Sequence, residues 1–262
     1  MNPRPDLTHV IFDFDGTLSW LRHGWPRLMA DIFRQYYPAP PDETETQILH
    51  RHLSEILSRN GQPTIFQMIH FAETVQARGG TCPEPEALRV EYQDRLDHII
   101  TERVGQLRRG EAQPDAFVVH GARPLLEQMR DRGLRLIILS GTLEERVREE
   151  AGWLKIADFF GPHIYGSGRD PRQFSKRQVI ARLLREENIP GRQILSFGDG
   201  PVEIQETKAV HGLAIGVASD EEHNGGGEPD PWKLPQLTQA GADALIADFR
   251  DPDKLLAAIF GR

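Results

Sequence analysis

Residues 9–18 read HVIFDFDGTL, and this stretch decides the fold of the chain. Its short apolar, β-rich run predicts a buried strand that delivers two carboxylates one residue apart and then breaks at Gly16. Side chains alternate along a strand, so Asp13 and Asp15 are expected to leave its end on the same side. Carboxylates this close repel each other, and Mg²⁺, which binds carboxylate oxygens together with substrate phosphate, is suited to hold them. On its own the stretch is also typical of a strand that ends in an Asp-Gly turn.

The composition argues against several classes of protein. The chain has 262 residues with 39 Asp and Glu against 31 Lys and Arg, and this net charge of −8 argues against binding of a nucleic-acid backbone. The single cysteine, Cys82, excludes an intramolecular disulfide and fits a reducing compartment. No apolar run is long enough to cross a bilayer, and the first one is interrupted at Asp13 before it could serve as a secretion signal. We therefore expect a soluble cytoplasmic protein with no nucleic-acid partner and no membrane partner.

Between residue 19 and about residue 115, apolar residues recur at helical rather than strand spacing. Four apolar stripes are present, each bounded by glycine or proline, and they fall at residues 25–36, 48–57, 65–75 and 85–107. No strand is expected between them. The pattern therefore predicts a compact α-helical domain at residues 19–115.

From residue 117 onward, expected strands alternate with expected helices, which is the pattern of a doubly wound parallel sheet. Strands are expected at 134–139, 163–165, 193–197, 213–217 and 244–246, and helices at 121–132, 142–151, 174–187, 202–210 and before the last strand. The glycine- and proline-rich segment up to Pro235 is expected to be a loop. The predicted fold class is α/β, with a Rossmann-like core formed by residues 1–18 and 116–262. The helical domain would be inserted after the first strand, over the carboxyl ends of the strands, where open sheets bind ligands.

Three further polar residues fall at or near the expected carboxyl edge of this sheet. Ser140 ends one strand, Asp199 follows another in a Gly-Asp-Gly sequence, and Lys176 opens the helix between them. Each also has a simple structural interpretation, as a helix N-cap, a turn residue and a solvated lysine respectively. Because the carboxyl ends of parallel strands meet at one edge, we expect all three to lie near the two carboxylates of the first strand.

With these motifs the chain resembles the haloacid dehalogenase-like hydrolase superfamily, in its phosphatase branch. The family's first motif, Asp-x-Asp-Gly-Thr, is matched by residues 13–17, and its second, a Ser or Thr after an apolar strand, by Ser140. The third, a Lys or Arg ahead of a helix, is best matched by Lys176, with Arg177 as the second choice. The fourth, often Gly-Asp-x-x-x-Asp, is matched by residues 198–203. The resemblance covers the whole chain, including a helical cap inserted between the first two motifs.

The resemblance implies a phosphatase that hydrolyses a small phosphorylated metabolite, such as a sugar phosphate, through an aspartyl-phosphate. Asp13 would be the nucleophile, and Asp15 would protonate the leaving oxygen and then activate water. Ser140, the Gly141 amide and Lys176 would hold the phosphoryl oxygens.

The resemblance also implies Mg²⁺ as cofactor, bound by Asp13, by the main-chain carbonyl of Asp15 and by Asp199. Glu203 stands where the family more often has Asp. Its extra methylene leaves direct contact with the metal open and favours an outer-shell role through water.

Two cap residues, Arg22 and His23, follow the first motif closely. They are suited to bind a second anionic or hydroxyl-rich part of the substrate, and they are equally typical of a solvated helix face.

Other branches and classes are distinguished by particular residues. Asp15 argues against the dehalogenases, which lack a second carboxylate in the first motif. The absence of any lysine before Lys155 argues against phosphonatases, which use a cap lysine. Sugar phosphomutases share all four motifs and remain an alternative. A non-catalytic regulatory module of this fold would be expected to have lost Asp13, Asp15 or Asp199, and all three are present.

Overall fold

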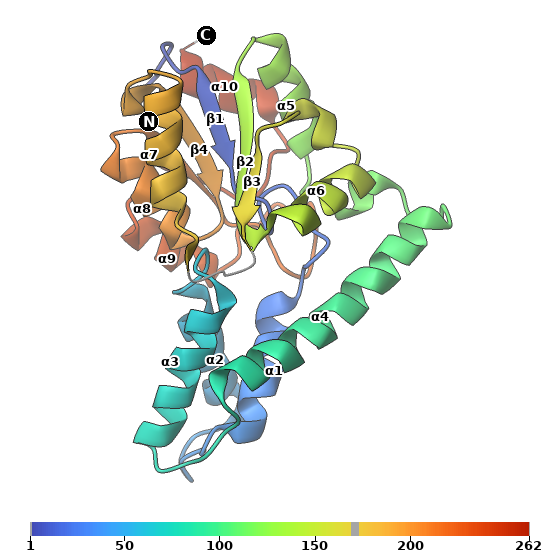
Figure 1. Ribbon diagram of the computed structural model, residues 1–262, viewed down its shortest axis with the longest axis vertical. Coiled ribbons are helices and arrows are strands. Elements are labelled where there is room, and N and C mark those ends of the chain that lie inside the picture. Colours follow the sequence, from blue (N-terminus) through green and yellow to red (C-terminus); the bar gives the residue numbers. More distant parts are fainter. Residues whose placement is uncertain (1, 169–172, 262) are drawn as a thin grey trace.

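The computed structural model describes residues 2–168 and 173–261. Its centre is a six-stranded sheet in the order β3-β2-β1-β4-β5-β6, in which all neighbouring strands are parallel (Figure 1). The strands are β1 His9–Phe12, β2 Arg135–Leu143, β3 Ile164–Ser167, β4 Ile194–Gly198, β5 Leu213–Val217 and β6 Ala244–Ile246. The predicted doubly wound parallel sheet is therefore confirmed.

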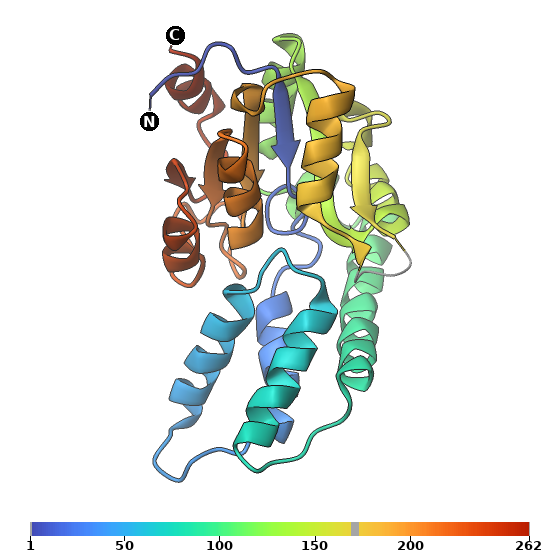
Figure 2. The same ribbon diagram turned by 60° about the vertical axis from the view of Figure 1, so that its left-hand side comes forward.

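Helices cover both faces of the sheet (Figures 1 and 2). One face is covered by α5 (Ala122–Asp131), α6 (Glu144–Trp153) and α10 (Pro252–Phe260), and the other by α7 (Lys176–Glu186), α8 (Pro201–Ala209) and α9 (Lys233–Gln239). Side chains of β1 alternate between the two faces of the sheet. Val10 and Phe12 pack in the apolar cluster that contains residues of α5, whereas Ile11 packs with residues of α7 on the other face. All four residues of β1 are buried, so the strand that precedes the two carboxylates is firmly held.

Four α-helices lie between β1 and α5 in the sequence, namely α1 (Trp25–Tyr36), α2 (Glu45–Leu57), α3 (Thr64–Ala77) and α4 (Pro85–Arg108). We call them the cap; they lie beyond the carboxyl ends of the strands (Figure 2). Local signals fix their ends: Thr44 and Gln47 form a capping box at the start of α2. Their apolar stripes meet in the middle, where the rings of Phe33 and Phe71 stack with centroids 3.9 Å apart.

The predicted start of α6 is wrong. The helix was expected from Thr142, but it begins at Glu144 because residues 140–143 continue β2. The pairing of β2 with β3 shifts register between Leu139 and Leu143, and this irregularity re-aims the end of the strand. Thr142 consequently donates a hydrogen bond to Asp15 rather than capping a helix.

The end of the chain also differs from expectation. The segment predicted as a loop up to Pro235 is helical from Lys233, where α9 begins. The last helix, α10, was not predicted, although Pro252 at its first position is typical of a helix start. None of the helices in the described ranges is long and apolar enough to span a bilayer.

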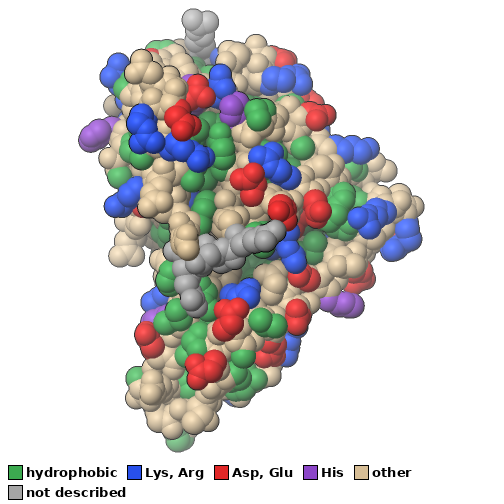
Figure 3. All heavy atoms as spheres, viewed as in Figure 1, with side chains coloured by type: hydrophobic (Ala, Val, Ile, Leu, Met, Phe, Trp, Pro, Cys, Tyr) green, Lys and Arg blue, Asp and Glu red, His purple; other side chains and the backbone are tan. Residues whose placement is uncertain are grey.

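The surface is rich in charges of both signs. On the face shown in Figure 3, Lys and Arg side chains are interspersed with Asp and Glu side chains. Some charged side chains of the protein form ion pairs with neighbours on the same helix, such as Arg95 with Glu91 and Arg148 with Glu144. Such exposed pairs contribute little to stability individually.

His52 lies in the core of the cap with 1% of its surface exposed. Its ring meets the rings of Phe33, Tyr37 and Phe71 edge-on, at centroid distances of 6.0, 4.8 and 6.1 Å. Burial lowers the pKa of His52 from 6.5 to about 4, since the charged ring would be poorly solvated there. The neutral ring is therefore part of the apolar core of the cap.

This burial predicts a pH dependence of stability. In the unfolded chain His52 takes up a proton as the pH falls below about 6.5, whereas in the folded protein it does so only near pH 4. The free energy of unfolding should therefore fall through this window, with a contribution from His52 of up to about 3 kcal/mol. Urea unfolding at pH 7, 5.5 and 4 measures the effect. His52→Phe should lose less stability over this range than the wild type, and the exposed control His98→Gln should not differ from it. Equal losses in His52→Phe and the wild type would contradict the prediction.

Candidate active site

A pocket of about 310 Å³ lies between the carboxyl ends of β1 and β2 and the cap. Six of the residues singled out from the sequence line it together: Asp13, Asp15, Arg22, Ser140, Gly141 and Lys176. Parallel strands explain this convergence, because β1, β2 and the segment before α7 all reach the same edge of the sheet.

Asp13 directly follows β1, and its main-chain N–H donates to the carbonyl oxygen of Phe197 in β4 at 2.9 Å. Its carboxylate accepts a hydrogen bond from Lys176 Nζ at 2.6 Å. Burial, with Glu203 and Asp199 as further causes, raises the pKa of Asp13 well above its usual range, although Lys176 acts in the opposite direction. An ionised Asp13 therefore needs more positive charge nearby than Lys176 alone supplies.

Lys176 is the first residue of α7, where Ser175 caps the helix by accepting from the N–H of Gln178. Its ammonium is buried and binds Glu203 of α8 as well as Asp13. The alternative, Arg177, is exposed and pairs with Glu206. Geometry thus favours Lys176 over Arg177 for the third motif.

Asp15 is held at both carboxylate oxygens. Thr142 Oγ1 donates to Oδ2 at 2.8 Å, and Arg22 Nε lies 2.9 Å from Oδ1. Arg22 is itself anchored by Glu150 of α6, at 2.5 Å, and both are buried. Burial raises the pKa of Glu150 to about 6, against the opposing effect of Arg22. The orientation of Asp15 is thus set by the end of β2 and by α6, and Thr142 and Glu150 were not predicted as site residues.

Ser140 is buried at the end of the regular part of β2. Its hydroxyl oxygen accepts a hydrogen bond from the main-chain N–H of Thr142 at 3.1 Å. Gly141 lies between them and lines the pocket. The end of β2 from Ser140 to Thr142 therefore lines the same pocket as Asp13 and Asp15.

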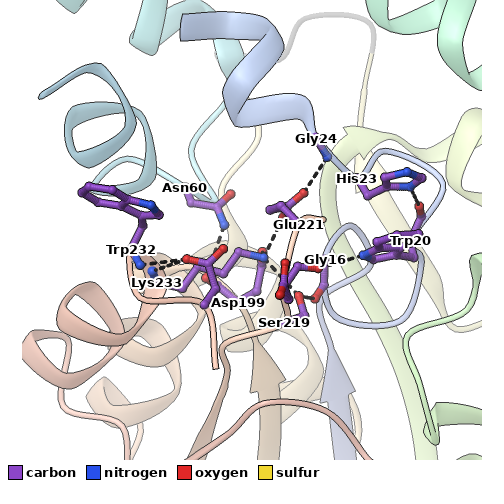
Figure 4. Close-up of polar contacts among 12 residues, drawn as sticks. Gly16, Trp20, His23, Gly24, Asn60, Asp199, Ser219, Glu221, Trp232 and Lys233 are labelled. Atoms are coloured by element: carbon purple, nitrogen blue, oxygen red, sulfur yellow. Dashed lines mark hydrogen bonds and ion pairs between the residues drawn. The ribbon is translucent and has the colours of Figure 1, made fainter. Parts of the chain in front are cut away.

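Asp199 follows β4 and lies against the loop after Asp15 (Figure 4). Gly16 has φ of +74°, and a Cβ atom there would lie only 2.2 Å from Asp199 Oδ2, so this position requires glycine. Lys233 Nζ lies 3.0 Å from this oxygen of Asp199. It also lies 2.7 Å from Oε1 of Glu221. Neither Lys233 nor Glu221 was predicted, because nothing in the local sequence reveals their burial.

The cap reaches the core through residues 60–62. Asn60 Nδ2 donates to the main-chain carbonyl of Asp199 at 3.3 Å. Gly61, with φ of +86°, lies so close to Glu203 that a Cβ atom there would be 2.5 Å from its Oε1. The fourth motif is thus covered directly by a cap loop.

The two predicted cap residues lie in different surroundings. Arg22 lines the pocket, but its guanidinium is bound by Asp15 and Glu150. His23 is not part of the pocket lining: its ring stacks on Trp20 at a centroid distance of 3.6 Å, and its Nδ1 lies 2.7 Å from the Trp20 carbonyl oxygen. Its Nε2 lies 2.8 Å from Arg103. The structure does not support substrate contact by His23, because both ring nitrogens are engaged outside the pocket.

The charge around Asp13 and Asp199 fits a divalent cation. Four acidic side chains share two ammonium groups here: Asp13 and Glu203 share Lys176, and Asp199 and Glu221 share Lys233. With all of them ionised, the excess of two negative charges equals the charge of one Mg²⁺, whose preferred donors are oxygens. Glu203 Oε2 is also buried without a hydrogen-bond partner among the described residues.

Side chains alone do not form a complete metal site in the described part of the chain. No three His, Cys, Asp or Glu side chains are grouped there so as to hold an ion. A donor set of two carboxylates, a main-chain carbonyl and water does not need such a group, and Mg²⁺ usually keeps several waters. The residues present therefore fit Mg²⁺ bound in this way.

The sequence model of one protein family, the haloacid dehalogenase-like hydrolases, matches residues 7–211 of the chain. None of the curated protein sequences matches the chain. Among solved structures, it is similar to a haloacid dehalogenase-like protein of unknown function from Agrobacterium tumefaciens, with 17% identity, a TM-score of 0.64 and coverage of 96% of this chain and 98% of the other. A predicted phosphoglycolate phosphatase from Haemophilus somnus is 14% identical, with a TM-score of 0.60 and coverage of 95% and 98%. A β-phosphoglucomutase from Clostridium difficile is 12% identical, with a TM-score of 0.56 and coverage of 93% and 92%. At these identities the likeness concerns the fold.

Proposed function

The chain belongs to the haloacid dehalogenase-like hydrolases, and on this premise we propose that it is a Mg²⁺-dependent phosphatase acting on a small phosphorylated metabolite. The observation that carries the proposal is the unequal environment of two carboxylates in one pocket. Asp13 is bound by an ammonium group, whereas Asp15 is held by a guanidinium and a hydroxyl. Pairs of acids in contrasting surroundings are typical of sites where the two have different catalytic roles.

In the first step Asp13 attacks the phosphorus, and the bond between phosphorus and the leaving oxygen breaks. Asp15 gives its proton to that oxygen, so the leaving group departs as a neutral alcohol. Lys176, the Ser140 hydroxyl and the Gly141 amide bind the phosphoryl oxygens while charge is redistributed among them.

In the second step water attacks the phosphorus of the aspartyl-phosphate. Asp15, now ionised, takes a proton from this water, and the bond between phosphorus and Asp13 breaks to release phosphate. Bound by Asp13, the main-chain carbonyl of Asp15 and Asp199, with Glu203 acting through water, Mg²⁺ would supply positive charge against the phosphoryl oxygens.

The cap side of the pocket suits an uncharged, hydroxyl-rich leaving group. Each arginine in the pocket lining is paired with a carboxylate: Arg22 with Glu150, Arg89 with Glu86 and Arg146 with Asp97. The same wall presents amide, hydroxyl and aromatic groups, from Trp25, Gln62, Thr64, Gln67, Tyr92 and Gln93. Paired arginines attract a second anion weakly, whereas amides exchange hydrogen bonds with hydroxyls. A sugar phosphate fits this wall better than a phosphorylated carboxylic acid.

Gln67 is the residue best placed to recognise such a substrate. It is 5% exposed, and its Oε1 has no hydrogen-bond partner among the described residues. A buried acceptor without a partner is costly, and a substrate hydroxyl would satisfy it.

Phosphate release from a panel of compounds with Mg²⁺ tests the function. The value of kcat/KM should be highest for phosphates of neutral sugars, lower for phosphorylated carboxylic acids, and lowest for p-nitrophenyl phosphate. Gln67→Leu should lower kcat/KM for the best sugar phosphate about tenfold, as expected for one lost hydrogen bond, and leave the aryl phosphate nearly unchanged.

The matched control is Gln76→Leu, the same substitution at an exposed position of α3. It should behave like the wild type on both substrates. If Gln67→Leu lowers kcat/KM equally for the sugar phosphate and the aryl phosphate, Gln67 has a structural role and does not recognise the substrate. If no compound of the panel releases phosphate, the proposed function itself is wrong.

A further inference from the structure

The segment from Ser219 to Lys233, which connects β5 to α9, carries a buried charge network behind the candidate metal ligand Asp199 (Figure 4). We propose that Lys233 is a positioning residue: it binds one oxygen of Asp199 and so presents the other to the divalent cation. This inference rests on the metal site of the proposed function.

The Lys233 ammonium is held within this network by two hydrogen bonds and one ion pair. Its Nζ lies 3.0 Å from Asp199 Oδ2, 2.7 Å from Glu221 Oε1 and 3.0 Å from Ser219 Oγ. Two of its three hydrogens are donated, to Glu221 and Ser219, and these two bonds fix the position of the ammonium, whose charge faces Asp199 Oδ2 in an ion pair without a hydrogen bond. The side chain of Lys233 is fully buried, and water does not compete for these bonds.

The partners of Lys233 are themselves anchored to the chain around the first motif. Ser219 Oγ donates to the carbonyl oxygen of Gly16, and Glu221 Oε2 accepts from the N–H of Gly24 at 2.9 Å, just before α1. At the other end, Asp230 accepts from the main-chain N–H groups of Trp232 and Lys233 and so fixes the start of α9. Lys233 is therefore a rigid support rather than a mobile side chain.

Asp199 is correspondingly held on one side only. Its Oδ2 lies beside Gly16 and forms an ion pair with Lys233 at 3.0 Å without a hydrogen bond, whereas Oδ1 forms neither a hydrogen bond nor an ion pair within the described residues. Buried ion pairs add little net stability compared with apolar residues of similar size, so stability alone does not account for a lysine at this position. Partners that orient a metal ligand, in contrast, strongly affect metal affinity.

The test is Mn²⁺ binding to the substrate-free protein, measured by isothermal titration calorimetry. The double variant Lys233→Met with Glu221→Gln removes one positive and one negative charge, so the net charge of the site is kept while Asp199 loses its support. The Kd for Mn²⁺ should rise about 10–100-fold, the size typical of lost ligand-orienting contacts.

The matched control is Lys208→Met with Asp243→Asn, which removes another lysine–carboxylate pair, with a 2.6 Å contact, just before β6 at the opposite edge of the sheet. Its Kd should equal that of the wild type, and circular dichroism melting should confirm that both double variants are folded. A Kd within about twofold of the wild type in folded Lys233→Met/Glu221→Gln would overturn the inference.

Asp199→Asn separates this inference from the function on which it rests. If Asp199→Asn weakens Mn²⁺ binding and the Lys233 variant does not, only the positioning role is wrong. If neither variant changes the Kd, the metal site of the proposed function is wrong as well. Should the double variant not fold, a crystal structure of the wild type with Mn²⁺ decides: an intact Lys233–Asp199 contact supports the inference, and its loss overturns it.

Discussion

Asp13→Asn is expected to abolish turnover and to leave the protein without any phosphoryl adduct, because an amide cannot replace the carboxylate as nucleophile. Asp15→Asn should fail differently. It keeps the nucleophile but lacks the acid and base, which typically contribute ~10²–10⁴-fold. With a good leaving group, phosphoryl transfer to Asp13 still proceeds, whereas hydrolysis of the aspartyl-phosphate lags. The adduct should therefore accumulate on Asp15→Asn.

Intact-mass measurement after a rapid acid quench shows the adduct directly. Asp31→Asn, an exposed change on α1, serves as control and should turn over like the wild type. Wild-type turnover in Asp13→Asn would show that Asp13 is not the nucleophile. A wild-type adduct that persists in water and clears only when a sugar phosphate is added would favour a phosphomutase instead.

Removal of divalent metal with a chelator is expected to abolish activity as well. The buried acids around Asp13 outnumber the two ammonium groups that hold them, and burial together with the neighbouring Glu203 and Asp199 raises the pKa of Asp13. Without added positive charge, Asp13 is a poor nucleophile and the site repels an incoming phosphate. Mg²⁺ should restore activity, and Ca²⁺ should do so poorly because it prefers a larger, looser coordination shell.

Two substitutions refine this result. Asp199→Ala should raise the Mg²⁺ concentration needed for half-maximal activity far more than Glu203→Ala, if Glu203 acts through water as proposed. Full activity in excess chelator would contradict a metal-dependent mechanism.

Most of the fold was predictable because its signals are local. The apolar spacing of residues 25–36 and 85–107 is that of a helix facing a core, and α1 and α4 follow it closely. The start of α6 was mispredicted because Thr142 looks like an N-cap, while the register shift that keeps it in β2 depends on β3. If the strand is continued from Ser140, the alternation of side chains places Thr142 on the same side of the strand as Ser140. This alternation is the signal that could have revealed Thr142 as a site residue.

The site residues that lie at or near the ends of strands could be predicted from the sequence. Those whose position depends on packing against distant parts of the chain could not. Asp13, Ser140 and Lys176 converge because parallel strands share an edge. Lys233 lies in a proline-rich segment without periodicity, and its burial results from contacts with residues far away in the sequence. For the same reason His23 looked available to a substrate, although its stacking on Trp20 engages it elsewhere.

The place of β1 in the sheet has a consequence for biosynthesis. β1 leaves the ribosome before every other strand, yet it lies at the centre, with His9 paired to Arg135 on one side and to Ile194 on the other. The cap helices contact near neighbours in the chain and can form early, whereas pairing over long sequence distances is slow. Until β4 has been synthesised, the apolar strand next to Asp13 lacks its second neighbour, so the nascent chain exposes apolar surface until late in synthesis.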